Sequence, residues 1–191
     1  MFEVYITKAA KYLPNDAVSN DEMEAYLGLI NDTASKARRI ILRNNKITSR
    51  YYAVDKTGKS THSNAELTRN AILPLFDENF TSQDLEVLSC GTSTPDIFLP
   101  SHAAMVHGLL KNKSVELNSS TGVCCAGMNS LKFGFLSIKS GKFKKCNLYR
   151  IRKSFDLAEC PKIQSRSRKL KKSRRTANYC FQKRFLKMDA F

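Results

Sequence analysis

The residues best suited to chemistry lie around a pair of adjacent cysteines, in Gly122-Val123-Cys124-Cys125-Ala126-Gly127, between an expected strand and an expected helix. A sulfur at the start of a helix meets unpaired backbone N–H groups and the positive end of the helix dipole. Both favour the thiolate, which is the reactive form of cysteine. The small residues Ala126 and Gly127 let a substrate carbonyl approach closely. Cys125 is therefore a candidate nucleophile, and a buried structural cysteine is the alternative, because free cysteines are commonly buried.

The elements around this site follow from hydrophobic periodicity and capping residues. Alternation predicts strands over 2–7, 85–90 and 114–117, with the second ending at Gly91. Helices are expected after the Ser19–Glu22 capping box, over 33–42, over 67–75 behind Ser63 or Asn64, from Pro100, and over 125–140 up to Gly141. Strands that alternate with helices indicate an α/β fold with a mixed or parallel sheet.

Charge divides the chain at about residue 145. The 191 residues carry a net charge of +15, of which residues 146–191 hold +11, from 14 Lys and Arg against 3 Asp and Glu. Residues 165–175 contain a single apolar side chain, so they cannot bury enough surface to offset the entropy of ordering. We expect one domain over 1–145 and an irregular basic tail over 146–191.

The six cysteines show no CxxC pair and no histidine at zinc spacing, so we expect no metal site. The sequence also shows no secretory signal and no apolar stretch long enough to cross a membrane. A cytoplasmic protein without a membrane segment or a bound cofactor is the simplest interpretation.

Six short segments follow one another along the chain: Tyr12-Leu13-Pro14, Ile47-Thr48-Ser49-Arg50, Gly91-Thr92-Ser93-Thr94-Pro95-Asp96, Leu99-Pro100-Ser101, Cys125-Ala126-Gly127 and Ile138-Lys139-Ser140-Gly141. Together they resemble the 3-oxoacyl-acyl-carrier-protein synthase III family of the thiolase superfamily. The resemblance covers residues 1–145, which implies the N-terminal half of a thiolase-like fold, with a mixed sheet flanked by helices. Lys46 stands where the family usually has glycine before the second segment.

The resemblance implies a mechanism and a set of partners. Cys125 takes the position of the nucleophile, which accepts an acyl group from acyl-coenzyme A or an acyl carrier, and malonyl-acyl carrier protein then condenses with loss of carbon dioxide. Arg50 would meet a coenzyme A or carrier phosphate, or it is a solvated arginine. Cys124 is expected to be a small core residue. The family forms homodimers and supplies a catalytic His, an Asn and an oxyanion donor from its second half, and none of His62, His102 and His107 matches that His.

The tail suggests a change of reading frame. One permissive choice of codons from Cys146 onwards, shifted by one nucleotide, spells Ala-Ile-Cys-Thr-Gly-Ser-Glu-Lys-Val, the strand and turn expected of the family at this point. The same shift turns Phe185–Phe191 into Phe-Leu-Arg-Trp-Met-Leu-Ser. We therefore expect a truncated enzyme, inactive alone, with an out-of-frame tail.

Two other functions stay open. A net charge of +11 in the tail would bind nucleic acid or an acidic surface through counterion release, although no nucleic-acid-binding signature accompanies it and we do not expect nucleic-acid binding. The chain would otherwise be the first half of a split enzyme, completed by a separately encoded second half.

Overall fold

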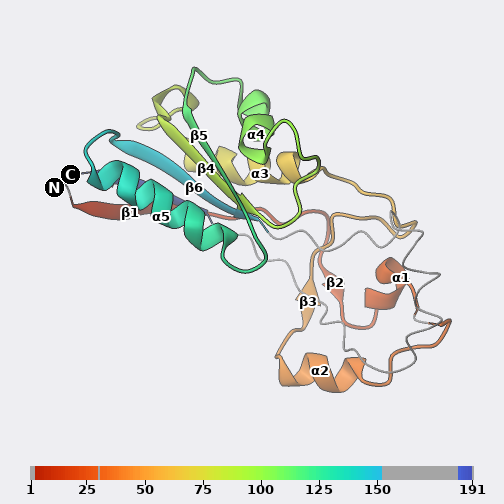
Figure 1. Ribbon diagram of the computed structural model, residues 1–191. Helices are drawn as coiled ribbons and strands as arrows, with labels where there is room; N and C mark the ends of the chain where they lie inside the picture. The colour runs from red at the N-terminus through yellow and green to blue at the C-terminus, as the bar shows by residue number, and fades with distance from the viewer. Residues whose placement is uncertain (1–2, 30, 152–184, 191) are drawn as a thin grey trace. The chain divides into compact units, whose positions relative to one another are not determined.

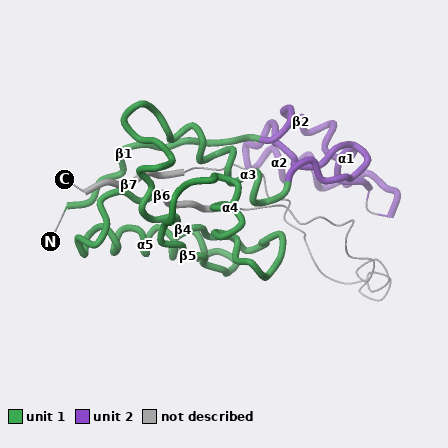
Figure 2. Tube along the Cα trace, turned by 90° about the horizontal axis from the view of Figure 1, so that it is seen from above, with its two compact units in different colours: residues 1–13, 63–153, 182–191 green, residues 14–62, 154–181 purple. Residues whose placement is uncertain are grey.

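The computed structural model describes residues 3–29, 31–151 and 185–190. The chain forms two compact units, shown in different colours in Figure 2. The first consists of Met1–Leu13, Ser63–Lys153 and Gln182–Phe191, and the second of Pro14–His62 and Ser154–Phe181.

Five strands form the mixed sheet of the first unit, in the order β1-β7-β6-β4-β5. The central strand β4 pairs in parallel with β5 on one side and with β6 on the other, whereas β7 lies antiparallel to both β6 and β1. Their bounds are β1 Val4–Ala10, β4 Val87–Thr92, β5 Glu116–Thr121, β6 Lys145–Ile151 and β7 Phe185–Ala190. The predicted α/β class with a mixed sheet is confirmed.

Helices cover both faces of this sheet (Figure 1). The helix α5 (Ala126–Lys139) lies on one face, and α3 (Asn64–Ile72) and α4 (His102–Leu110) lie on the other. Two short 3-10 helices, η1 (Leu73–Leu75) and η2 (Ser82–Asp84), connect α3 to β4.

Alternation along β4 divides the core between these two faces. Leu88 and Cys90 are buried in the larger cluster, which includes residues of α3 and α4. Val87 is buried in a second cluster with Ile138 of α5 and Cys146 of β6. Successive side chains of a strand point to opposite faces, and helices cover both faces of this sheet. As a result, β4 is buried along its whole length, and α5 packs against one of its faces.

The helix ends follow the local signals in the sequence. Ser63 caps α3 in a complete capping box with Glu66, and the Ser101 side chain accepts a hydrogen bond from the Ala104 N–H at the start of α4. At the end of α5, Gly141 has a φ of 79°, and its N–H bonds to the Ile138 carbonyl.

The second unit is a small cluster built on short elements. The strands β2 (Val18–Ser19) and β3 (Ser49–Arg50) pair antiparallel, and α1 (Met23–Leu27) and α2 (Arg38–Asn44) complete the unit. Its core consists of Val18, Met23, Leu42 and Tyr52. The predicted helix over 33–42 begins later, at Arg38, and continues to Asn44. Ahead of it, the Ser35 N–H donates to the Glu24 Oε1 at 2.9 Å, so the Glu24 side chain bonds a backbone group of the segment expected to be helical.

Two segments of the expected irregular tail are strands. The segments β6 and β7 lie inside the sheet, so strand pairing continues past the expected boundary at residue 145. The reason is non-local, because β4 has a free edge on the side to which α5 returns the chain, and backbone pairing fills it. The basic run over 165–175 lies outside the described residues.

Candidate active site

Cys125 is the N-cap residue of α5, at the point where the chain leaves β5 and enters the helix. The segment is open: Val123, Cys124 and Cys125 are all exposed, and Val123 is 80% exposed. The Cys125 side chain makes no capping hydrogen bond, whereas its carbonyl accepts from the Asn129 N–H at 2.8 Å. The thiol is therefore accessible and is not used to hold the helix.

Gly91 lets the first turn of α5 approach β4 closely. A Cβ atom at this position would lie 2.4 Å from the Ala126 carbonyl oxygen and 2.8 Å from the Ser130 Oγ. Real Cβ atoms essentially never come this close, so only glycine fits without a shift of the helix. Because Ala126 directly follows Cys125, this contact fixes the height of the cysteine above the sheet.

Hydrogen bonds among Ser89, Asn118 and Ser130 also hold the first part of α5 against the sheet. The Ser89 Oγ donates to the Ser130 carbonyl oxygen at 3.2 Å and accepts from the Asn118 Nδ2 at 2.8 Å. Ser89 and Ser130 are fully buried, so breaking these bonds would leave polar groups without water. These hydrogen bonds connect β4, β5 and α5 beneath the candidate nucleophile.

The loop after β4 is attached to the start of α3. One Asp96 carboxylate oxygen accepts from the Asn64 N–H at 2.7 Å, and the other accepts from the Ala65 N–H at 2.8 Å. The Asn64 Nδ2 donates in turn to the Thr92 Oγ1 at 3.1 Å and to the Thr94 carbonyl oxygen at 2.7 Å. A carboxylate at a helix N-terminus is electrostatically favourable, so the loop is held at the N-terminus of α3.

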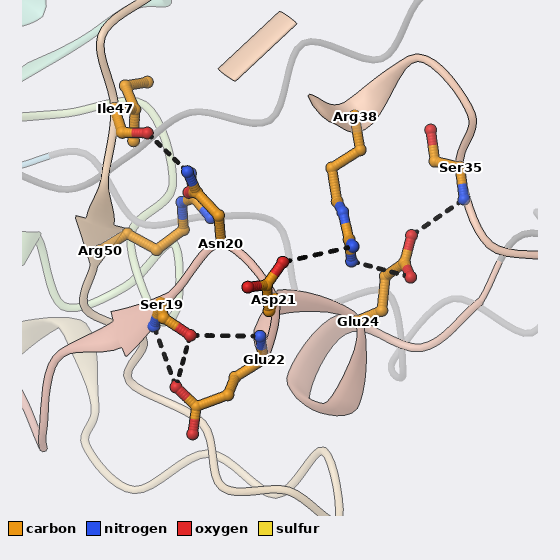
Figure 3. A network of polar contacts seen from close by, with 9 residues as sticks. All are labelled: Ser19, Asn20, Asp21, Glu22, Glu24, Ser35, Arg38, Ile47 and Arg50. Atoms are coloured by element: carbon orange, nitrogen blue, oxygen red, sulfur yellow. Dashed lines mark hydrogen bonds and ion pairs between the residues drawn. The ribbon is translucent and has the colours of Figure 1, made fainter. Parts of the chain in front are cut away.

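Arg50, the predicted phosphate-binding residue, belongs to the second unit and is only 3% exposed. Its Nη2 donates to the Asn20 Oδ1 at 2.9 Å, and the Asn20 Nδ2 donates to the Ile47 carbonyl oxygen at 2.8 Å, as Figure 3 shows. The alternative of a solvated arginine is therefore wrong. Within the described ranges, the Arg50 Nη1 has no hydrogen-bond partner.

The two candidate residues lie in different units, Cys125 in the first and Arg50 in the second. The expectation that Cys124 is a small core residue is wrong, because its side chain is exposed beside Cys125. The difference arises because both cysteines precede the first helical residue, where no face of α5 yet turns inward.

Two further cysteines and two histidines, Cys90, Cys146, His102 and His107, are buried or held by hydrogen bonds within the fold. Cys90 and Cys146 are buried, and burial raises the pKa of the Cys90 thiol. His102 is buried and shares a 3.0 Å hydrogen bond with the Thr68 hydroxyl, and His107 bonds to the Lys113 carbonyl. Over the described residues, no group of three or more His, Cys, Asp or Glu side chains could hold a metal ion. Nor does any helix in those ranges have the length and hydropathy to span a membrane.

Residues 53–60 approach the G-x-x-x-x-G-K-[ST] spacing of a phosphate-binding loop, with Ala53 in place of the first glycine. The Asp55 carboxylate accepts from the N–H groups of Thr57 at 2.8 Å and Lys59 at 3.0 Å. The chain's own carboxylate thus occupies two of the amides that would bind a phosphate, and no helix follows Ser60 directly. We assign no phosphate site to this loop.

Curated proteins that are similar to this chain are named beta-ketoacyl-[acyl-carrier-protein] synthase III. It is 27% identical over 145 residues to a beta-ketoacyl-[acyl-carrier-protein] synthase III from Chlorobaculum tepidum, and 30% identical over 133 residues to one from Rickettsia massiliae. The matches cover 73% and 70% of this chain but only 40% and 38% of those proteins. The chain therefore spans about two fifths of the length of the curated relatives it matches. No family model matches it.

Solved structures confirm the fold. A tetronic acid condensing enzyme superposes with a TM-score of 0.74 at 17% identity, covering 98% of this chain and 52% of that one. The 3-oxoacyl-[acyl-carrier-protein] synthase III from Aquifex aeolicus superposes with a TM-score of 0.70 at 20% identity, covering 98% and 54%. The chain is thus a homologue of the beta-ketoacyl-[acyl-carrier-protein] synthase III enzymes, with a thiolase-like fold and a partial match that fits their N-terminal half.

Proposed function

We propose that this chain supplies the nucleophile-bearing half of a beta-ketoacyl-acyl-carrier-protein synthase III, with Cys125 as the nucleophile. The observation that carries the proposal is an exposed thiol at the N-terminus of a 14-residue helix that packs tightly on the central strand. Backbone N–H groups of a helix N-terminus stabilise negative charge on such a sulfur. The position falls within the stretch homologous to the condensing enzymes.

In the proposed reaction, the Cys125 sulfur attacks the thioester carbonyl of an acyl-coenzyme A, and the coenzyme A thiol leaves. The carboxylate of malonyl-acyl carrier protein is then lost as carbon dioxide. The resulting carbanion attacks the acyl-cysteine, and the Cys125 sulfur is released. We propose acyl carrier protein and acyl-coenzyme A as partners, a homodimer as the assembled form, and fatty acid or polyketide-type biosynthesis as the setting.

In the family that this chain resembles, the condensation step needs further groups. In the family, a His, an Asn and an oxyanion donor come from the second half of the fold, and one oxyanion donor alone contributes a factor of about 10²–10³ in rate. We therefore propose that the chain alone accepts an acyl group slowly and does not condense it. Arg50 is proposed to meet a coenzyme A or carrier phosphate through its buried Nη1, which has no hydrogen-bond partner among the described residues.

We also propose that residues from Cys146 onwards arise from a shifted reading frame. Participation of β6 in the sheet does not separate the two frames, because strand pairing uses backbone groups that any sequence provides. The coding DNA from codon 140 to beyond the stop separates them. Restoration of an Ala-Ile-x-x-Gly-Ser-Glu strand in another frame supports the proposal, and a single intact frame contradicts it.

Acyl transfer is tested by mass spectrometry of the full chain after incubation with an acyl-coenzyme A. We expect a hydroxylamine-sensitive acyl group on the peptide that contains Cys125. The matched control is Cys124→Ala, which removes the neighbouring thiol and should keep the acyl group, whereas Cys125→Ala should lose it. Acylation at Cys124, or none at Cys125, contradicts the assignment of the nucleophile.

A further inference from the structure

Cys124 and Cys125 are two exposed thiols on consecutive residues, at the open start of α5. Neither sulfur forms a disulfide, and the two other described cysteines, Cys90 and Cys146, are buried. The nucleophile of the proposed reaction uses only one of the two exposed thiols. The second, at Cys124, is left without a role in acyl transfer.

A direct disulfide between these two residues is sterically unfavourable. Consecutive Cα atoms of a trans peptide lie about 3.8 Å apart, whereas disulfides join Cα atoms usually about 4.4–6.8 Å apart. A single bridging atom between the sulfurs lengthens the link and removes this restriction. The pair is therefore better suited to binding one thiophilic centre with both sulfurs than to closing on itself.

We propose that Cys124 and Cys125 together form a dithiol site for trivalent arsenicals. For an arsine oxide, each thiol gives up its proton, two arsenic–sulfur bonds form, and the arsenic oxygen leaves with the two protons as one water. Arsenic stays trivalent, so the step needs no oxidant or reductant. Soft centres of this kind select sulfur over nitrogen and oxygen donors.

The advantage of the pair comes from effective concentration. Once one sulfur holds the arsenic, the second attacks from the adjacent residue, so its local concentration exceeds that of a free monothiol competitor in solution. The buried thiols cannot compete, because the arsenical would have to open the core to reach them. The proposal does not rest on acyl transfer, but a bound arsenical occupies the Cys125 sulfur and would block its acylation.

The experiment uses the full chain with Cys160→Ser and Cys180→Ser, which removes the two thiols outside the described residues. One equivalent of phenylarsine oxide is added, followed by excess glutathione and then by 2,3-dimercaptopropanol, with intact mass measured at each stage. We expect one adduct that survives glutathione and is removed by the dithiol. Fragmentation should place the arsenic on the peptide containing residues 124 and 125.

Two single variants test the requirement for both sulfurs. In Cys124→Ser and in Cys125→Ser, glutathione should strip the adduct at a concentration lower by a factor of about 10² or more. Circular dichroism checks that each variant folds, which is expected because both positions are exposed. Equal glutathione resistance in either single variant, or loss of the parent adduct to glutathione, overturns the proposal. Acylation without arsenic capture would overturn the dithiol site alone and leave the proposed nucleophile intact.

Discussion

Replacing Gly91 with alanine should push the first turn of α5 away from the sheet. The added Cβ would lie 2.4 Å from the Ala126 carbonyl oxygen, against an optimal contact of about 3.5 Å, so the first turn must move by about 1 Å. Overpacking of this kind typically costs about 1–3 kcal/mol. The alanine also restricts the unfolded chain, which offsets about 0.4–1 kcal/mol of that cost. We expect a net loss of about 1 kcal/mol in the free energy of unfolding.

The assay is urea or thermal unfolding of the full chain, with acylation of Cys125 as a second readout. A loss of about 1 kcal/mol lowers the melting temperature by about 2–4 °C for a chain of this size. A displacement of about 1 Å at a reacting group can lower the rate by a factor of about 10², so acylation of Cys125 should slow more than stability alone explains.

Gly108→Ala is the matched control. Gly108 lies in α4 and is exposed, and a Cβ added there would have no atom within 4 Å, so alanine meets open space. Alanine inside a helix is about 0.5–1 kcal/mol more favourable than glycine, and this variant should be stabilised. If Gly91→Ala unfolds like Gly108→Ala and acylates at the parent rate, the close approach of α5 to β4 does not exist and the reasoning fails.

Three further predictions concern the loop after β4, the second unit and the acid response. Asp96→Ala removes both acceptors at the start of α3, and chemical unfolding should show a loss of about 1–2 kcal/mol, with no loss for Glu78→Gln at an exposed site. Asn20→Ala removes the partner of buried Arg50, and urea unfolding of the second unit should show a loss of about 1–3 kcal/mol, whereas an unchanged midpoint would mean that Arg50 is solvated. Hydrogen bonds hold four carboxyl pKa values below their ordinary range, so the stability that these groups contribute is fully present above about pH 4. This stability falls as the pH drops through the lowered pKa values of the folded state. An acid titration of the melting temperature should reveal the loss. These groups and the main donors to them are Glu22 with Ser19, Asp55 with Thr57, Asp77 with Lys8 and Asp84 with Thr81.

Local signals predicted the local parts of this structure. The Ser63 capping box needs only residues three apart, so the start of α3 was readable from the sequence. At Ser19 the expected reciprocal bonds with Glu22 form, with Oγ and Oε2 2.7 Å apart, although α1 itself begins at Met23 (Figure 3). Gly141 ends α5 as expected. Each of these features depends on a few neighbouring residues and not on what packs against them.

Non-local contacts decided the features that the sequence did not predict. Gly91 was expected to end its strand, but β4 continues to Thr92, and the glycine is required because α5, which comes much later in the chain, packs on that position. A glycine inside a strand is itself a sign of close backbone approach, and that sign was present in the sequence. The strands β6 and β7 likewise depend on partners far away in the chain, which no local pattern around them records.

Arg50 is buried and Cys125 is exposed, so the two residues that the sequence analysis assigned to one site have opposite contact with water. Folding has already removed water from the Arg50 guanidinium, which bonds to Asn20 through one nitrogen. An anionic ligand that reached the Nη1 would therefore not have to offset the cost of desolvating this charge. An exposed thiol, in contrast, becomes selective only when another surface excludes water from it. The described residues hold Cys125 in position from below, through Gly91, Ser89 and Ser130, and leave its upper side open. The arrangement therefore positions the proposed nucleophile without enclosing it, which is why we expect the proposed acyl transfer to Cys125 to be slow.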